Sequence, residues 1–171
     1  MNSIITRCAS VALLTAALGA CSSSPKSLEQ TLIEQPVRSA PFELTTSSRG
    51  PKVTLNDVLF DFEKATLRPQ ATGVIEQAAK FLDQNPGRVA LIEGHTDHTG
   101  DARYNVLLSE ARSEVVRDAL IAAGAPKSRI QTESFGETRP VASNNTPEGR
   151  QQNRRVEIIF KANTETTFTQ L

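Results

Sequence analysis

The sequence of 171 residues contains no tryptophan, a single tyrosine and two cysteines, and its formal net charge is zero. Nucleic-acid-binding domains usually carry a clear excess of Lys and Arg, which this chain lacks. The shortage of aromatic side chains also argues against a platform on which bases stack. Hydrophobic residues make up 38% of the chain and charged residues 22%, a balance typical of a soluble globular domain.

The first twenty residues differ from the rest of the chain. They contain one charged side chain, Arg7, followed by a largely apolar run from Val11 to Leu18. This run is too short to cross a bilayer, which needs about 20 apolar residues. A basic start, a short apolar segment and small residues before a cleavage point are typical of an export signal. We therefore interpret residues 1–20 as a signal peptide.

Small residues lead directly into the second cysteine. Leu18-Gly19-Ala20-Cys21 resembles the lipobox of bacterial lipoproteins. That resemblance implies cleavage before Cys21 and acylation of the new N-terminal cysteine, with palmitate among the acyl chains. Several acyl chains anchor a protein stably where one would not. Because Ser22, and not Asp, follows the cysteine, the pattern predicts the outer membrane of a Gram-negative bacterium, with the protein facing the periplasm. Cys8 is lost with the signal.

Composition divides the remaining chain into three parts. Residues 21–50 are rich in Ser, Thr and Pro, and we interpret them as a lipidated cysteine and a flexible tether. Residues 51–162 carry the regular hydrophobic patterns of a folded domain. Residues 163–171 form a polar tail.

Hydrophobic periodicity predicts two helices and four strands within the domain. Helices are expected over about 69–84, with Pro69 in the first turn, and over about 101–123, ended by Gly124. Strands are expected over 52–62, 89–94, 130–134 and 156–160. Residues 135–153 form a long polar connection in which Thr146-Pro147 could begin one helical turn. The order β-α-β-α-β-β predicts an α/β (α+β) fold: an open mixed sheet with two helices on one face.

The second predicted helix places a permanent cation on the face that it should bury. Arg112 falls within an apolar arc formed by Leu108, Ala111, Val115, Val116, Ala119 and Leu120. Burying a guanidinium in apolar surroundings costs on the order of several kcal/mol of folding free energy unless it is paired and hydrogen-bonded. Either Arg112 pairs with a neighbouring carboxylate and holds the helix to a loop, or it lines a pocket for an anionic ligand.

Other polar residues gather at the start of the same helix. Asp97 and Thr99 follow the second main strand, and Asn105 lies two helical turns before Arg112 on the same face. Ligands of open α/β sheets bind where strands end and helices begin. An acid, a hydroxyl, an amide and a guanidinium that converge there would suit a zwitterion, with its ammonium on Asp97 and its carboxylate on Arg112.

These residues belong to a longer spaced pattern, and residues 52–161 resemble the OmpA-like C-terminal domain, a module also found in peptidoglycan-associated lipoprotein. The family core reads T-D, ten residues, L-S, two residues, R-A, two residues, V, three residues, L. The matching residues are Thr96-Asp97, Leu108-Ser109, Arg112, Val116 and Leu120; Phe60-Asp61-Phe62, Gly136-Glu137 and Asn153-Arg154-Arg155-Val156-Glu157 extend the match. Ser113 departs from the usual Ala; we expect it on the outer side of the helix, where a one-atom change should have little effect.

The resemblance implies non-covalent binding of peptidoglycan through the diaminopimelate of the stem peptide, and thus a tether between outer membrane and cell wall. Asp97 would bind its ammonium and Arg112 its carboxylate. Thr99 and Asn105 would add polar contacts, and Arg154 would approach a ligand carboxylate from the last strand.

Two other positions are less closely tied to the ligand. Glu63 aligns loosely with a position that lines the site in relatives. Arg155 is interpreted as a structural ion pair on the sheet.

Three rival interpretations remain. His95 and His98 suggest a metal, but a zinc site usually needs three or four ligands and the chain has no third histidine. A hydrolase acting on the same polymer would need an activated nucleophile or an acid–base pair, which the mature domain does not offer in a recognisable arrangement. The main partner could instead be another periplasmic protein of the envelope. We expect no enzyme activity, no cofactor and no metal.

Overall fold

A computed structural model of the chain describes residues 40–61 and 64–163. The predicted signal peptide, Cys21, most of the predicted tether, Glu63 and residues 164–171 lie outside the described residues, and so do the predictions made for them. Among the described residues, no helix is both long enough and apolar enough to cross a membrane.

The centre of the fold is a five-stranded mixed sheet in the order β1-β2-β5-β3-β4. Its strands are β1 (Thr45–Ser47), β2 (Gly50–Asn56), β3 (Arg88–His95), β4 (Ile130–Ser134) and β5 (Arg155–Ala162). Only the pair β3–β4 is parallel, and the α-helix between these two strands provides the crossover that a parallel pair needs. The other neighbours are antiparallel. The predicted open mixed sheet is confirmed.

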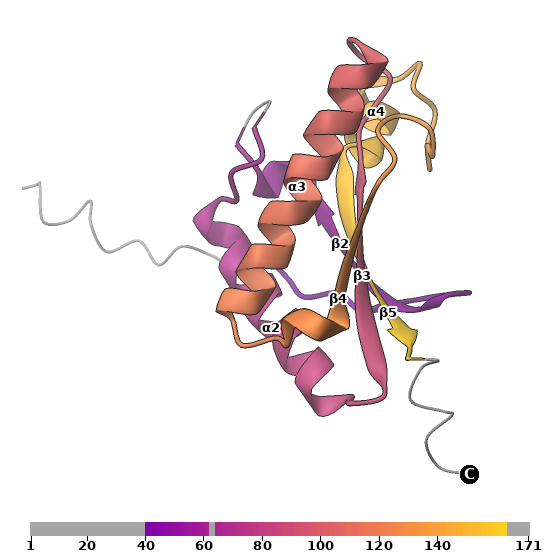
Figure 1. Ribbon diagram of the computed structural model, residues 1–171. Helices are drawn as coiled ribbons and strands as arrows, with labels where there is room; N and C mark the ends of the chain where they lie inside the picture. Colours follow the sequence, from indigo (N-terminus) through magenta and orange to yellow (C-terminus); the bar gives the residue numbers. More distant parts are fainter. Residues whose placement is uncertain (1–39, 62–63, 164–171) are drawn as a thin grey trace, which may run out of the picture. The chain divides into compact units, whose positions relative to one another are not determined.

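Two long helices, α2 (Thr72–Gln84) and α3 (Ala102–Ala122), lie on one face of this sheet (Figure 1). The side chain of Asp101 caps α3 by accepting the backbone N–H groups of Arg103 and Tyr104. Gly124, with φ of 97°, turns the chain away just after the helix ends. A short helix, α4 (Pro147–Asn153), begins at the predicted Thr146-Pro147, where the Thr146 hydroxyl accepts the N–H of Gly149.

The hydrophobic core fills the space between the sheet and the two helices. Alternate residues of each central strand point into it, and one stripe of α2 covers them. Gly94 brings β3 against α3: a Cβ at this position would lie 2.1 Å from the backbone oxygen of Ser109. The core residues of β3, β5 and α2 are Ala90, Ile92, Val156, Ile158, Phe160, Val74, Ile75, Ala78, Ala79 and Leu82.

The buried stripe of α3 is polar in its first half and apolar in its second. Asn105, Ser109, Arg112 and Ser113 are buried, followed by Val116 and Leu120. The expectation that Ser113 lies on the outer side of the helix is wrong, since it is 1% exposed. The predicted apolar arc is therefore only partly right, because Leu108, Ala111, Val115 and Ala119 keep partial exposure. The first half of α3 faces the strand ends and the loop after β4, where backbone groups need polar partners.

The sheet begins earlier than the predicted domain boundary at residue 51. Residues 45–47, assigned to the tether, form the edge strand β1, and Gly50, with φ of 126°, opens β2. Ala40 and Phe42 also pack against the core. The sequence gives no signal for this edge strand because its residues are polar and do not alternate between apolar and polar side chains.

The predicted strand over 52–62 is too long. It ends at Asn56, and Asp57–Leu59 form a 3-10 turn that carries Phe60 into the core. The backbone N–H of Asp57 donates to the carbonyl of Arg154 at 3.1 Å, which fixes where the chain leaves the sheet.

Candidate functional site

A cavity of about 260 Å³ opens between the end of β3, the first half of α3 and the segment that enters β5. Asp97 and Thr99 lie on the turn that follows β3, while Arg154 immediately precedes β5. All five predicted site residues line this one cavity: Asp97, Thr99, Asn105, Arg112 and Arg154. Asp57, Thr96, Tyr104, Leu108 and Arg150 complete its wall.

Arg112 is buried, with 2% of its side chain exposed, and is held by several contacts at once. One terminal nitrogen donates to Asp57 at 3.1 Å, and Nε donates to the Lys64 carbonyl at 3.1 Å. The guanidinium also lies 5.2 Å from the centre of the Phe60 ring. Burial lowers the pKa of Arg112, and Asp57 offsets part of that effect. Arg112 therefore pairs with a neighbouring carboxylate, as the first interpretation predicts, and it also lines the cavity. Its role in binding an anionic ligand stays a prediction.

Four charged side chains that line the cavity form a chain of ion pairs. Arg154 donates from Nε to Asp57 at 2.8 Å and from a terminal nitrogen to Asp97 at 2.7 Å. Asp57 thus bridges Arg112 and Arg154, so that two acids and two bases alternate along one network.

The network keeps Asp97 ionised. Burial by itself would raise the pKa of the Asp97 carboxyl, but hydrogen bonds from Arg154 and from the backbone N–H of Thr99 hold it below its ordinary value. Burial likewise works against charge on Arg154, and its two carboxylate partners raise its pKa nonetheless. At neutral pH the cavity therefore presents fixed charges of both signs.

Asn105 acts as a support for the site. Its amide nitrogen donates to Glu137 at 2.7 Å and to the Thr99 carbonyl at 3.1 Å. Gly136, whose φ is 51°, lets the loop after β4 approach α3, and its N–H donates to Ser109 at 3.0 Å. These contacts hold the turn containing Asp97 and Thr99 against the start of α3.

Sequence reasoning missed three charged or aromatic residues of the wall. Asp57 lies in a segment predicted as strand, and no spacing connects it with Arg112, 55 residues away. The sequence pattern gives no sign of Tyr104 and Arg150 either, because it places each as a polar residue on an exposed helix surface. A capping threonine at 146 places α4 correctly, but only the packed structure turns Arg150 towards the cavity.

His95 and Asp97, two residues apart in the chain, lie in different environments. Asp97 lines the cavity, whereas His95 is buried beside Glu93 and stacks on Phe135 with 5.5 Å between ring centres. Burial, together with the nearby Arg155, lowers the pKa of His95 to about 4.

The predicted structural role of Arg155 is confirmed. Its Nε donates to Glu157 at 2.8 Å, and it is buried on the sheet, outside the residues that line the cavity.

Except for Asp57, the residues that line the cavity lie within residues 59–154, the part of the chain that matches the model of the OmpA family. The chain belongs to the OmpA family. Its fold matches that of a solved relative. The peptidoglycan-associated lipoprotein of Burkholderia pseudomallei is 31% identical and superposes with a TM-score of 0.58. The aligned part covers 63% of this chain and 89% of the Burkholderia chain.

Two curated relatives extend this OmpA-family likeness. The probable lipoprotein YiaD of Escherichia coli is 42% identical over 105 residues, which are 61% of this chain and 48% of YiaD. The peptidoglycan-binding protein ArfA of Mycobacterium tuberculosis is 39% identical over 107 residues, 63% of this chain and 33% of ArfA. The chain thus spans about a third to a half of these relatives, and the likeness lies in the OmpA-like domain.

Proposed function

We propose that the cavity binds peptidoglycan non-covalently by gripping the zwitterionic end of a diaminopimelate side chain. The observation that carries this proposal is the mixed charge of one small cavity: two carboxylates, Asp57 and Asp97, face three guanidiniums, Arg112, Arg150 and Arg154. A ligand that offers an ammonium and a carboxylate on one carbon can satisfy both signs at once. A purely anionic or purely cationic ligand would leave one set unmatched.

The ligand would bind by exchanging partners within the network. Its ammonium would meet Asp97, whose carboxylate is held in place by the N–H of Thr99 at 2.8 Å. Its carboxylate would share Arg112 and Arg154 with Asp57. Because these groups are already paired with one another, binding replaces ion pairs and does not fill bare charges. The net gain at each site is therefore modest.

The names of the relatives support this assignment. ArfA is a peptidoglycan-binding protein, and the Burkholderia structure is a peptidoglycan-associated lipoprotein. None of these names denotes an enzyme, which agrees with a binding function.

We further propose that the domain works as a mechanical link. Acylation of Cys21 in the lipobox would hold the chain in the outer membrane, and the segment before the domain would reach towards the wall. Many copies on a repetitive polymer hold firmly even when each contact is weak, because each further attachment is effectively intramolecular.

The deciding experiment compares two stem peptides by calorimetric titration of the purified protein. One carries diaminopimelate; the other carries lysine, which keeps the ammonium and lacks the terminal carboxylate. We expect the lysine peptide to bind at least 10-fold more weakly, since Arg112 and Arg154 lose a charge-assisted contact of about 1.5–3 kcal/mol. Equal affinity for the two peptides would overturn the assignment.

A further inference from the structure

A second cluster of titratable groups lies away from the cavity, on the sheet face that points away from α2 and α3. Glu93 of β3 and Glu157 of β5 are direct cross-strand partners in the antiparallel register. Both are buried, with 1% and 4% exposure. Like charges placed opposite each other destabilise a sheet, so this pair needs neighbours that compensate for it.

Arginine and lysine side chains now neutralise the two acids. Arg49 forms a two-pronged contact with Glu93, while Lys52 and Arg155 donate to one oxygen of Glu157 at 3.0 and 2.8 Å. The side chains of Arg49 and Lys52 reach the surface, with 44% and 27% exposed. Burial would raise the pKa of Glu157, but these hydrogen bonds hold it below its ordinary value.

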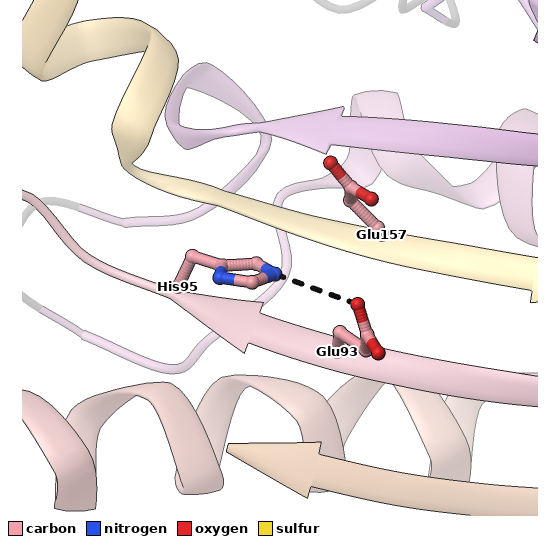
Figure 2. Close-up of side chains that lie close together, drawn as sticks. All are labelled: Glu93, His95 and Glu157. Atoms are coloured by element: carbon pink, nitrogen blue, oxygen red, sulfur yellow. Dashed lines mark ion pairs between the residues drawn. The ribbon is translucent and has the colours of Figure 1, made fainter. Parts of the chain in front are cut away.

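His95 points into the same cluster without a hydrogen-bond partner. Its side chain is 2% exposed, and neither ring nitrogen forms a hydrogen bond within the described part of the chain. Figure 2 shows its ring between the two strands, with Nε2 directed at Glu93 across 3.9 Å and Glu157 nearby. A buried polar group left without a partner costs about 1–3 kcal/mol, so the ring is held here at a cost.

We propose that Glu93, His95 and Glu157 form a binding site for a single divalent metal ion of the zinc type. One imidazole nitrogen and two carboxylates are ligands that Zn²⁺ accepts, and three protein ligands leave one further position for water. The ligand atoms of the three residues lie within 4.8 Å of one another. Ligands around a tetrahedral zinc ion are spaced by roughly 3.3–3.6 Å, given bonds of about 2.0–2.2 Å, so the side chains need to close by about an ångström.

The charge balance permits this exchange. Three cations of the cluster are partly exposed: Arg49, Lys52 and Arg139, which lies 3.9 Å from Glu93 and stacks on the Phe135 ring. Arg139 can keep this place, whereas Arg49 and Lys52 can extend into water. When Arg49 and Lys52 move away, the divalent ion supplies the two positive charges that they removed, so the net charge of the cluster stays unchanged. Arg155 remains on one oxygen of Glu157, so the other oxygen is available to the metal.

The ion would join the two central strands of the sheet. Since Glu93 and His95 lie on β3 and Glu157 lies on β5, coordination ties these strands together at the end nearest the cavity. The predicted effect is a higher stability of the folded domain, which grows with the logarithm of the ratio of the free Zn²⁺ concentration to its dissociation constant. Peptidoglycan binding uses other residues and does not depend on this site.

The test is a Zn²⁺ titration of the full chain, purified in detergent, by calorimetry and native mass spectrometry. Cys8→Ser and Cys21→Ser are introduced throughout, so that no thiolate binds the metal. We expect one Zn²⁺ per chain, a rise in melting temperature with Zn²⁺, and at least a 10-fold loss of affinity in His95→Gln. His98→Gln is the matched control, because His98 is exposed and lies three residues further along the chain. It should bind like the parent.

Glu157→Gln provides a second variant if His95→Gln does not fold, and it should lose affinity to a similar degree. Absence of Zn²⁺ binding at millimolar metal would overturn the proposal. So would unchanged binding in a folded His95→Gln or Glu157→Gln protein, or a loss of binding in His98→Gln.

Discussion

Replacing Asp97 by asparagine tests the proposed ammonium contact most directly, because the change removes a charge and keeps the shape of the side chain. Asp97 is almost enclosed, with 8% of its side chain exposed, and it accepts the N–H of Thr99 at 2.8 Å. An asparagine oxygen can accept the same N–H, so the turn after β3 should keep its conformation. Ligand binding and folding can therefore be separated in this variant.

The expected loss of affinity follows from one charge-assisted contact. A hydrogen bond between an ammonium and a buried carboxylate contributes about 1.5–3 kcal/mol, which corresponds to roughly a 10- to 150-fold weaker dissociation constant. The cost to folding should be smaller, about 1 kcal/mol, because Arg154 is a third exposed and keeps its contact with Asp57.

The assay combines calorimetric titration with a diaminopimelate stem peptide, co-sedimentation with sacculi, and urea unfolding. Asp61→Asn is the matched control: Asp61 is also a carboxylate paired with an arginine, but it is 46% exposed and lies outside the cavity wall. A folded Asp97→Asn protein that binds as tightly as the parent would refute the ammonium contact. An equal loss in Asp61→Asn would show that general charge, and not the site, governs binding.

Four further results are expected. Arg112→Ala should lose sacculus binding and also about 2–4 kcal/mol of unfolding free energy in urea, because a buried ion pair is broken; a stability loss below about 0.5 kcal/mol would contradict the buried pairing. The pKa of Asp97 is lower in the folded state than its unfolded value of about 3.9. The carboxylate therefore stabilises the fold above that unfolded value, and this contribution is lost as pH falls through the folded-state pKa. Between about pH 5 and pH 2, the unfolding free energy of Asp97→Asn should therefore change less with pH than that of the parent. Gly94→Ala should destabilise the domain by about 3 kcal/mol or more, measured by thermal unfolding, because the new methyl group meets the Ser109 backbone; a parent-like melting temperature would show that α3 can move away. Cys21→Ser should shift the protein from the outer-membrane fraction to the soluble periplasmic fraction, and retention in the membrane would refute the lipid anchor.

Local patterns predicted most of the regular elements. The apolar spacing over 74–82 corresponds to α2, and the helix predicted over about 101–123 and ended by Gly124 corresponds to α3. The alternation at 156–160 lies within β5. Such signals are local: each depends on side chains a few residues apart, so the sequence displays them without knowledge of the fold. The spaced pattern around Asp97 and Arg112 likewise led to the cavity, because turn and helix fix those two residues in one region.

Contacts between distant segments decided the rest. Asp57 reaches Arg112 and Arg154 only because the chain leaves β2 in a 3-10 turn beside the start of β5. Glu93 meets Glu157 only because β3 and β5 pair in one particular register, in which a shift by one residue would turn each acid to the other face. Sequence by itself thus determined most of the helices and strands and five of the residues that line the cavity. Tertiary structure alone decided which opposite charges share a pocket, because register and packing join residues that no local pattern connects.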